Sequence, residues 1–286
     1  MKSFANKSLF VVSILLMGNL FFSACNKDKT DPETAPVPLL ASYTRFDNKG
    51  VIYYSQSFQY DNQRRLIKET FHNGLILTFE YSGSTVIEKG KGYQVFDGIA
   101  VGQLNNQGLC ISLSSGSAYN KKIDYYDNGY QKSTIDESPA GIYTSTFTVS
   151  EGNYVTSTYE VKSKTTNSAL AKEIDHFKSA IIPSSWRNTF VSENGLTSSA
   201  SDFSIKTKYQ FYTDKLNTFG NENMGTSFYG KGNKNPIKTE SINYYNSMDV
   251  FESSGVINYT YEYDTKGRIT KQLSDNGYYS IFTYID

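Results

Sequence analysis

Glycine and lysine recur between Gly225 and Lys231 at a spacing that can bind phosphate. The seven residues GTSFYGK fit the first seven positions of the phosphate-binding loop G-x-x-x-x-G-K. The eighth position is Gly232, where a Ser or Thr hydroxyl should hold magnesium. Pro236 and the neighbouring asparagines also oppose the helix that has to follow such a loop. We therefore expect no nucleotide site and interpret this stretch as a glycine-rich loop that leads into an extended segment.

Histidine and cysteine are too scarce for most zinc or nucleophilic sites. The chain has two of each, whereas zinc sites usually take three or four such ligands. His72 adjoins a predicted turn and His176 lies in a stretch of helical spacing, and no pattern brings a Ser or Cys toward either. Cys110 lies among apolar neighbours, which indicates a buried side chain. We expect no metal and no cofactor.

Several aspartates lie in predicted turns, Asp61 and Asp264 among them. Hydrogen bonding within the turn accounts for them, and no dense Asp-x-Asp-x-Asp calcium loop occurs. A catalytic carboxylate pair needs no fixed sequence spacing, so an extracellular hydrolase acting on a polysaccharide or other polymer stays open. Sugar-cleaving clefts usually use tryptophan, and the chain has only Trp186. We expect a non-enzymatic binding or scaffolding domain, with the hydrolase as the alternative.

The composition favours an all-β protein that does not bind nucleic acid. Lys and Arg number 28 against 28 Asp and Glu, without the basic surplus that binds a polyanion. The 24 Tyr and 18 Phe are set among Ser, Thr and Gly, which is the composition of strands.

The N-terminal residues predict an export signal. Lys2 and Lys7 precede a mostly apolar run over 9–22, which is shorter than the roughly 20 residues of a spanning helix. The run ends in Ser23-Ala24-Cys25, which resembles the lipobox of bacterial lipoproteins. That resemblance implies that residues 1–24 are removed and that Cys25 is lipidated. A plain signal peptide cut nearby is the alternative.

Residues 25–40 are predicted to form a flexible tether, because they are charged, rich in proline and without periodicity. The folded domain is then expected over 41–286. A lipid at Cys25 would hold it to the bacterial outer membrane, on the cell-surface or the periplasmic side. A glycan or an outer-membrane protein is the kind of partner that we consider.

Period-2 segments alternate with turn signals from Tyr43 onward. The alternation over 51–60 places Ile52, Tyr54, Phe58 and Tyr60 on one face of a strand. Asn-Gly and Asp-x-x-Gly turn signals, such as those ending in Gly267 and Gly277, separate segments of this kind. The pattern predicts a long antiparallel meander of roughly 14 to 20 strands, at roughly 10 residues per strand and turn. Because strand twist accumulates, the sheet must curl into a rolled sheet or an open barrel. Helical spacing over 168–182 is compatible with one short helix.

Two hairpins have a recurring Tyr-Asp pattern. Tyr263-Asp264-Thr265-Lys266-Gly267-Arg268 is similar to the Y-D-x-x-G-R unit of RHS proteins, and Tyr60 to Leu66 is a second copy with Arg64 in the glycine position. Together with the lipobox and the tether, these hairpins resemble a group of Bacteroides-type outer-membrane lipoproteins whose domain is porin-like in fold. The resemblance rests on structural turns and implies no catalytic residues.

Overall fold

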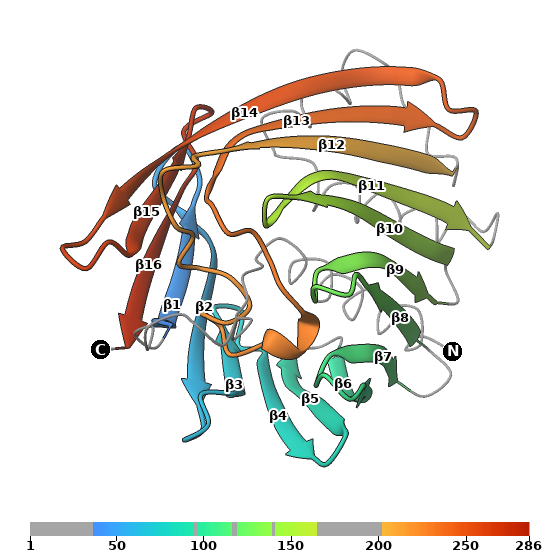
Figure 1. The fold of residues 1–286 in the computed structure, drawn as a ribbon, viewed down its shortest axis with the longest axis vertical. Coiled ribbons are helices and arrows are strands. Elements are labelled where there is room, and N and C mark those ends of the chain that lie inside the picture. The colour runs from blue at the N-terminus through green and yellow to red at the C-terminus, as the bar shows by residue number, and fades with distance from the viewer. Residues whose placement is uncertain (1–36, 94–95, 116–118, 139–140, 165–201, 286) are drawn as a thin grey trace.

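Each strand pairs antiparallel with the strand before it and the strand after it, and the first strand pairs with the last to close a barrel (Figure 1). The computed structural model describes residues 37–93, 96–115, 119–138, 141–164 and 202–285. The prediction of an all-β meander that curls on itself is confirmed, and pairs such as Leu39 with Ile285 close the barrel. The helix considered for 168–182 lies outside the described residues.

The barrel has 16 strands, a number within the expected range. They are β1 (Leu39–Phe46), β2 (Ile52–Tyr60), β3 (Leu66–Phe71), β4 (Ile76–Ser82), β5 (Thr85–Tyr93), β6 (Phe96–Leu104), β7 (Cys110–Ser115), β8 (Tyr119–Tyr125), β9 (Gln131–Glu137), β10 (Gly141–Ser150), β11 (Asn153–Ser163), β12 (Phe203–Phe211), β13 (Ile237–Asn246), β14 (Phe251–Tyr263), β15 (Ile269–Ser274) and β16 (Tyr279–Ile285). A 3-10 turn, η2 (Ser227–Tyr229), lies between β12 and β13. Within the described ranges, no helix has the length and apolar character needed to cross a membrane.

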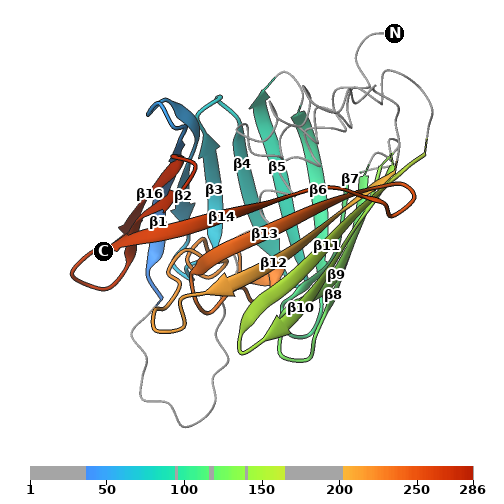
Figure 2. The same cartoon turned by 90° about the horizontal axis from the view of Figure 1, so that it is seen from above.

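Side chains alternate between a buried inner face and a more exposed outer face, because successive residues of a strand point to opposite sides. In β8, Tyr119, Lys121 and Ile123 are buried while the residues between them are exposed. The buried faces of many strands join into one apolar cluster that also contains Phe219 and Phe228 from the β12–β13 connection. Figure 2 shows how strongly β12–β14 are inclined to β3–β5 as the sheet closes.

The hairpin turns use the chemistry that the sequence predicts. Asp61 Oδ1 accepts hydrogen bonds from the backbone amides of Gln63 and Arg65. Asp264 Oδ1 accepts the equivalent pair from the residues two and four positions later. Arg64 takes the glycine position of its turn with φ 65°, in the left-handed region. This conformation costs a non-glycine residue about 1 kcal/mol.

One detail of the predicted face of β2 is wrong. Ile52 is 53 % exposed, whereas Phe58 is buried. The register between β1 and β2 shifts between Arg45 and Phe46, the residue that pairs with Ile52. A bulge of this kind reorients the side chains beyond it.

Candidate functional site

The connection between β12 and β13 runs across one end of the barrel (Figure 1). We call residues 212–236 the crossing segment and this end of the barrel the crossing end. The backbone of the segment is hydrogen-bonded to strand starts and hairpin turns from several parts of the wall. These bonds are Leu40 N to Asn223 O (2.7 Å), Leu66 N to Gly225 O (3.0 Å), Lys231 N to Gly129 O (2.8 Å) and Lys234 N to Gly152 O (2.8 Å). The partners belong to β1, β3, the β8–β9 turn and the β10–β11 turn, so the segment is fixed to well-separated strands.

Buried asparagines hold the crossing segment in place. Asn235 and Asn153 exchange two hydrogen bonds, one from Asn153 Nδ2 to Asn235 Oδ1 at 3.0 Å and one from Asn235 N to Asn153 Oδ1 at 2.9 Å. Asn233 Oδ1 accepts a bond of 2.7 Å from the amide of Tyr154. A buried loop needs such partners, because an unpaired backbone group away from water is costly.

Two glycines allow the crossing segment to pass close to the turns. Gly225 has φ 67°, and a Cβ there would lie 2.7 Å from the amide nitrogen of Leu66. Gly230 has φ 88°, and a Cβ there would lie 2.6 Å from a ring carbon of Tyr125. Both positions therefore require glycine for its conformation and for its size.

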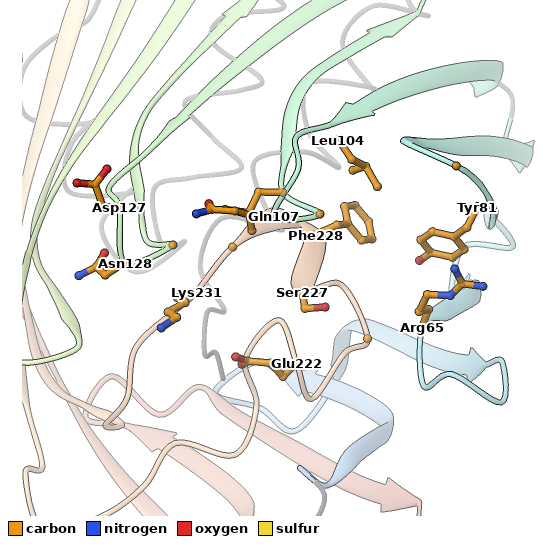
Figure 3. Close-up of a pocket in the computed structure, with 16 residues that line it drawn as sticks. Arg65, Tyr81, Leu104, Gln107, Asp127, Asn128, Glu222, Ser227, Phe228 and Lys231 are labelled. Carbon is orange, nitrogen blue, oxygen red and sulfur yellow. The ribbon is translucent and has the colours of Figure 1, made fainter. Parts of the chain in front are cut away.

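A pocket of about 510 Å³ lies between the crossing segment and four hairpin turns (Figure 3). We call it the rim pocket. It is lined by residues at or beside the β2–β3, β4–β5, β6–β7 and β8–β9 turns and by the crossing segment. Its apolar and aromatic side chains are Tyr81, Leu104, Leu109 and Phe228. Its polar side chains are Arg65, Gln107, Asp127, Asn128, Glu222, Ser227 and Lys231.

The arginine of the rim pocket is held in one orientation. Arg65 forms an ion pair with Asp61, with 2.7 Å between Nη2 and Oδ2. Its guanidinium carbon lies 4.3 Å from the ring centroid of Tyr81. Tyr81 meets Phe228 edge-on, with 6.0 Å between ring centroids. The guanidinium and the two rings thus form one preorganised wall.

Two carboxyl groups are buried in the inner wall. Glu69 on β3 and Glu88 on β5 are 8 % and 7 % exposed. Burial, and to a smaller extent the nearby Glu88, raise the pKa of Glu69 to about 8. A hydrogen bond from Gln56 acts in the opposite direction and lowers this pKa. Burial also raises the pKa of Glu88 to about 7. These groups therefore hold protons in a range where an exposed glutamate is ionised.

An ion pair is buried in another part of the wall. Lys121 Nζ on β8 is 3.3 Å from Asp136 Oδ1 on β9, and their side chains are 2 % and 5 % exposed. Tyr119 donates a hydrogen bond to the same carboxylate, as does the Thr134 hydroxyl at 3.4 Å. This network supplies the partners that a buried charge pair needs.

The turn residues that the sequence singles out all lie at hairpin ends. Asp61 and Asp264 accept the backbone bonds given above, and each also pairs with the arginine four residues later. Gly267 and Gly277 have φ of 76° and 88°, the region that favours glycine. Asp61 pairs with Arg65, which lines the rim pocket. Gly277 adjoins Asn48 at the other end of the barrel. Cys25 lies outside the described residues.

The structure also places three other features that the sequence singled out. The GTSFYGK stretch is part of the crossing segment and contains a 3-10 turn of three residues, and residues 232–236, where a phosphate-binding loop would continue into a helix, are not helical. Cys110 is fully buried, and burial raises its thiol pKa to about 12. His72 is exposed, and its Nδ1 accepts a hydrogen bond of 3.3 Å from the amide of Ser55. His176 lies outside the described residues.

Sequence reasoning missed the buried charges and the rim pocket. A signal for the first was present, because Glu88 and Lys121 fall on the apolar phase of their strands, two residues from Val86 and Ile123. The pocket has no comparable signal, since its residues come from separate turns.

Solved structures that resemble this chain include two porin-like proteins. One is a porin-like protein from Bacteroides uniformis ATCC 8492, with a TM-score of 0.49, 12% identity, and coverage of 89% of this chain and 100% of that chain. The other is a porin-like protein from Bacteroides vulgatus ATCC 8482, with a TM-score of 0.52, 8% identity, and coverage of 86% of this chain and 99% of that chain. The second likeness supports a porin-like β fold and transfers no residue role. No family model and no curated protein matches the sequence.

Proposed function

We propose that the protein is a lipid-anchored binding module of the bacterial outer membrane, whose barrel lies outside the bilayer. In this proposal Cys25 carries the lipid, and the barrel presents binding surfaces at the cell surface or in the periplasm. The tether ends at residue 38 and not at 40 as expected, because β1 begins at Leu39, whose side chain is buried. A glycan or an outer-membrane protein is the kind of partner that we favour.

One observation supports a position of the barrel outside the bilayer. A rung of outward side chains crosses seven neighbouring strands, β8 to β14, through successive cross-strand pairs. Its members are Asp124, Ser133, Thr146, Thr158, Lys206, Asn243 and Ser254. Every member is polar and two are charged. On the opposite wall, a second polar rung across β16, β1, β2 and β3 consists of Thr283, Ser42, Ser57 and Thr70.

Exposed aliphatic side chains on the outer face are interrupted by polar neighbours. Ile99 on β6 pairs across the sheet with Lys89, and Ile135 on β9 pairs with Lys122. These lysines would have to enter the hydrocarbon together with the isoleucines beside them. Scattered apolar residues of this kind are normal on a water-exposed surface.

This distribution of polarity is the reverse of that in a membrane-spanning barrel. A spanning barrel carries an outward apolar band about 25 Å tall and a polar interior. Here the buried inner face carries residues such as Tyr143, Ile205 and Phe282. A lysine on the lipid face is unfavourable in a spanning barrel, and Lys206 lies on the outer face within β12. The outer face is therefore suited to water.

The chain enters β1 at the crossing end. Asn223 Nδ2 donates a hydrogen bond of 2.7 Å to the carbonyl of Pro38, directly before the first strand. Pro38 is 13 positions after Cys25, a length of chain that spans about 45 Å when fully extended. A lipid at Cys25 would then keep the crossing end toward the membrane.

The hydrolase alternative has one observation in its favour, the raised pKa values of Glu69 and Glu88. Their positions favour it less. Both side chains are buried in the wall, and neither belongs to the rim pocket. We therefore prefer binding to hydrolysis.

Fractionation of cells tests the proposal. Palmitate should label the wild-type chain and leave Cys25→Ala unlabelled. A second variant, in which a signal peptide cleaved without lipidation replaces residues 1–25, should be recovered folded from the periplasm without detergent. Recovery of this second variant only from detergent-solubilised membranes would overturn the external position of the barrel. Equal labelling of wild type and Cys25→Ala would overturn the anchor.

A further inference from the structure

We propose that the rim pocket binds a neutral saccharide unit. This inference names a ligand for the binding module and therefore rests on the proposed function. The pocket has about 510 Å³ of space, within the range of small-molecule sites, and lies at the crossing end of the barrel (Figure 3).

The walls of the pocket are fixed before any ligand binds. Lys231 N donates to Gly129 O at 2.8 Å, and Leu66 N donates to Gly225 O at 3.0 Å, so the crossing segment is tied to the turns on two sides. The β6–β7 turn is held by Asn105, whose Oδ1 accepts bonds from the backbone amides two and four residues later. A preformed site loses less conformational entropy when a ligand binds.

The accessible charges of the pocket are balanced. Arg65 is already paired with Asp61, and Lys231 and Asp127 are of opposite sign. The carboxylate oxygens of Glu222 are buried. An anionic ligand would meet Asp127, and a cationic ligand would meet Lys231 and Arg65. A wholly apolar ligand would remove Lys231 and Asp127 from water without replacing their hydrogen bonds. The balance therefore favours a neutral ligand with many polar groups.

The remaining groups suit the hydroxyls of a sugar. Gln107 and Asn128 each provide an amide that donates and accepts, and Ser227 adds a hydroxyl. All three residues are exposed, so the polar side of the pocket is open to solvent. Tyr81, Leu104 and Phe228 give the pocket an apolar edge that C–H groups of a sugar can contact.

Matched variants distinguish the pocket from the surrounding surface. Gln107 and Gln63 occupy the same position of equivalent turns, since the backbone amide of each donates to the side chain two residues earlier. Only Gln107 lines the pocket. Lys231 and Lys234 lie in the same segment, and only Lys231 lines the pocket.

Ligand-observed NMR titration tests the proposal on the purified full-length lipoprotein, held in micelles of a detergent without a sugar headgroup. The ligands are glucose, galactose, mannose, maltose, lactose and cellobiose. We expect at least one sugar to bind, with a Kd raised fivefold or more by Gln107→Ala and by Lys231→Met. Gln63→Ala and Lys234→Met should leave the Kd within twofold of wild type. Circular dichroism checks that each variant is folded.

Three outcomes would overturn the saccharide site. They are no binding of any sugar by folded wild type, an equal loss in the control variants, and stronger binding of glucuronate or of a dipeptide than of every neutral sugar. These outcomes leave the proposed function intact, because cell fractionation alone decides the anchor and the position of the barrel.

Discussion

The hydroxyl of Tyr81 donates a hydrogen bond of 2.8 Å to the carbonyl oxygen of Leu66, 15 residues earlier in the chain. The same separation relates Tyr125 to Cys110 and Tyr284 to Ile269. Each acceptor is the first residue of a strand, and each tyrosine comes from the end of the next strand. The bond thus ties together the open ends of the hairpins β3–β4, β7–β8 and β15–β16.

Two of these hairpins share a further arrangement. In each, an arginine lies over the ring of the tyrosine and pairs with the aspartate four residues earlier. The members are Asp61, Arg65 and Tyr81 in one hairpin and Asp264, Arg268 and Tyr284 in the other. The Tyr-Asp pattern of the sequence therefore coincides with a repeated cluster of aspartate, arginine and tyrosine at one end of the barrel.

Tyr81→Phe should lower the free energy of unfolding by about 1 kcal/mol, because it removes the hydrogen bond to Leu66 and leaves the ring under Arg65. Urea denaturation measures the change. Tyr53→Phe is the control, since Tyr53 is 48 % exposed, and it should change stability by less than about 0.5 kcal/mol. Equal effects of the two substitutions would mean that the Tyr81 bond contributes nothing.

Gly230→Ala should destabilise the protein more than Gly267→Ala. Both glycines have positive φ, which costs alanine about 1 kcal/mol. A Cβ at Gly267 meets nothing within 4 Å, whereas a Cβ at Gly230 would lie 2.7 Å from the carbonyl oxygen of Gly129. Thermal melts of both variants compare them. Equal shifts would show that the crossing segment can move away from the β8–β9 turn.

The sequence predicted the meander because its turn signals are local. An aspartate or asparagine followed by glycine determines the conformation of a hairpin without help from distant residues, as Asp264 and Gly267 illustrate. Which face of a strand is buried is harder to predict. Beside the bulge in the pairing of β1 with β2, Ile52 is exposed although it was expected on the same face as Phe58.

Burial of charge has a weaker signal. Lys121 and Lys122 are adjacent and chemically identical, yet only Lys121 is buried. Strand phase places Lys121 on the face of Ile123, but the Asp136 that pairs with it there lies on the neighbouring strand. The rim pocket depends even more on distant residues, because Gly225 of the crossing segment meets Leu66 from far earlier in the chain.

Lys121→Met should lower stability by about 3–5 kcal/mol, because it leaves the Asp136 carboxylate buried without its cation. The double variant Lys121→Met/Asp136→Leu should recover part of this loss. The exposed pair of Lys206 and Asp249 is the control, and Lys206→Met should cost much less than Lys121→Met. A double variant as unstable as Lys121→Met would contradict this account.

Glu69→Gln should make stability less dependent on pH. The pKa of Glu69 is raised from 4.5 to about 8 in the folded protein, chiefly by burial, so the folded state holds a proton that the unfolded state releases above about pH 4.5. The stability that this group contributes to wild type is thus fully present below pH 4.5 and falls as the pH rises toward 8. A glutamine side chain cannot ionise. The variant should therefore be more stable than wild type by about 1 kcal/mol or more at about pH 8.5, and no more stable at about pH 4.5.

Urea denaturation at these two pH values measures the effect of Glu69→Gln. Glu80→Gln is the control, because it makes the same substitution on the exposed face of β4. The comparison separates a buried carboxyl group from an exposed one in the same hairpin. A constant difference between Glu69→Gln and wild type across the range would mean that Glu69 is ionised in the folded barrel.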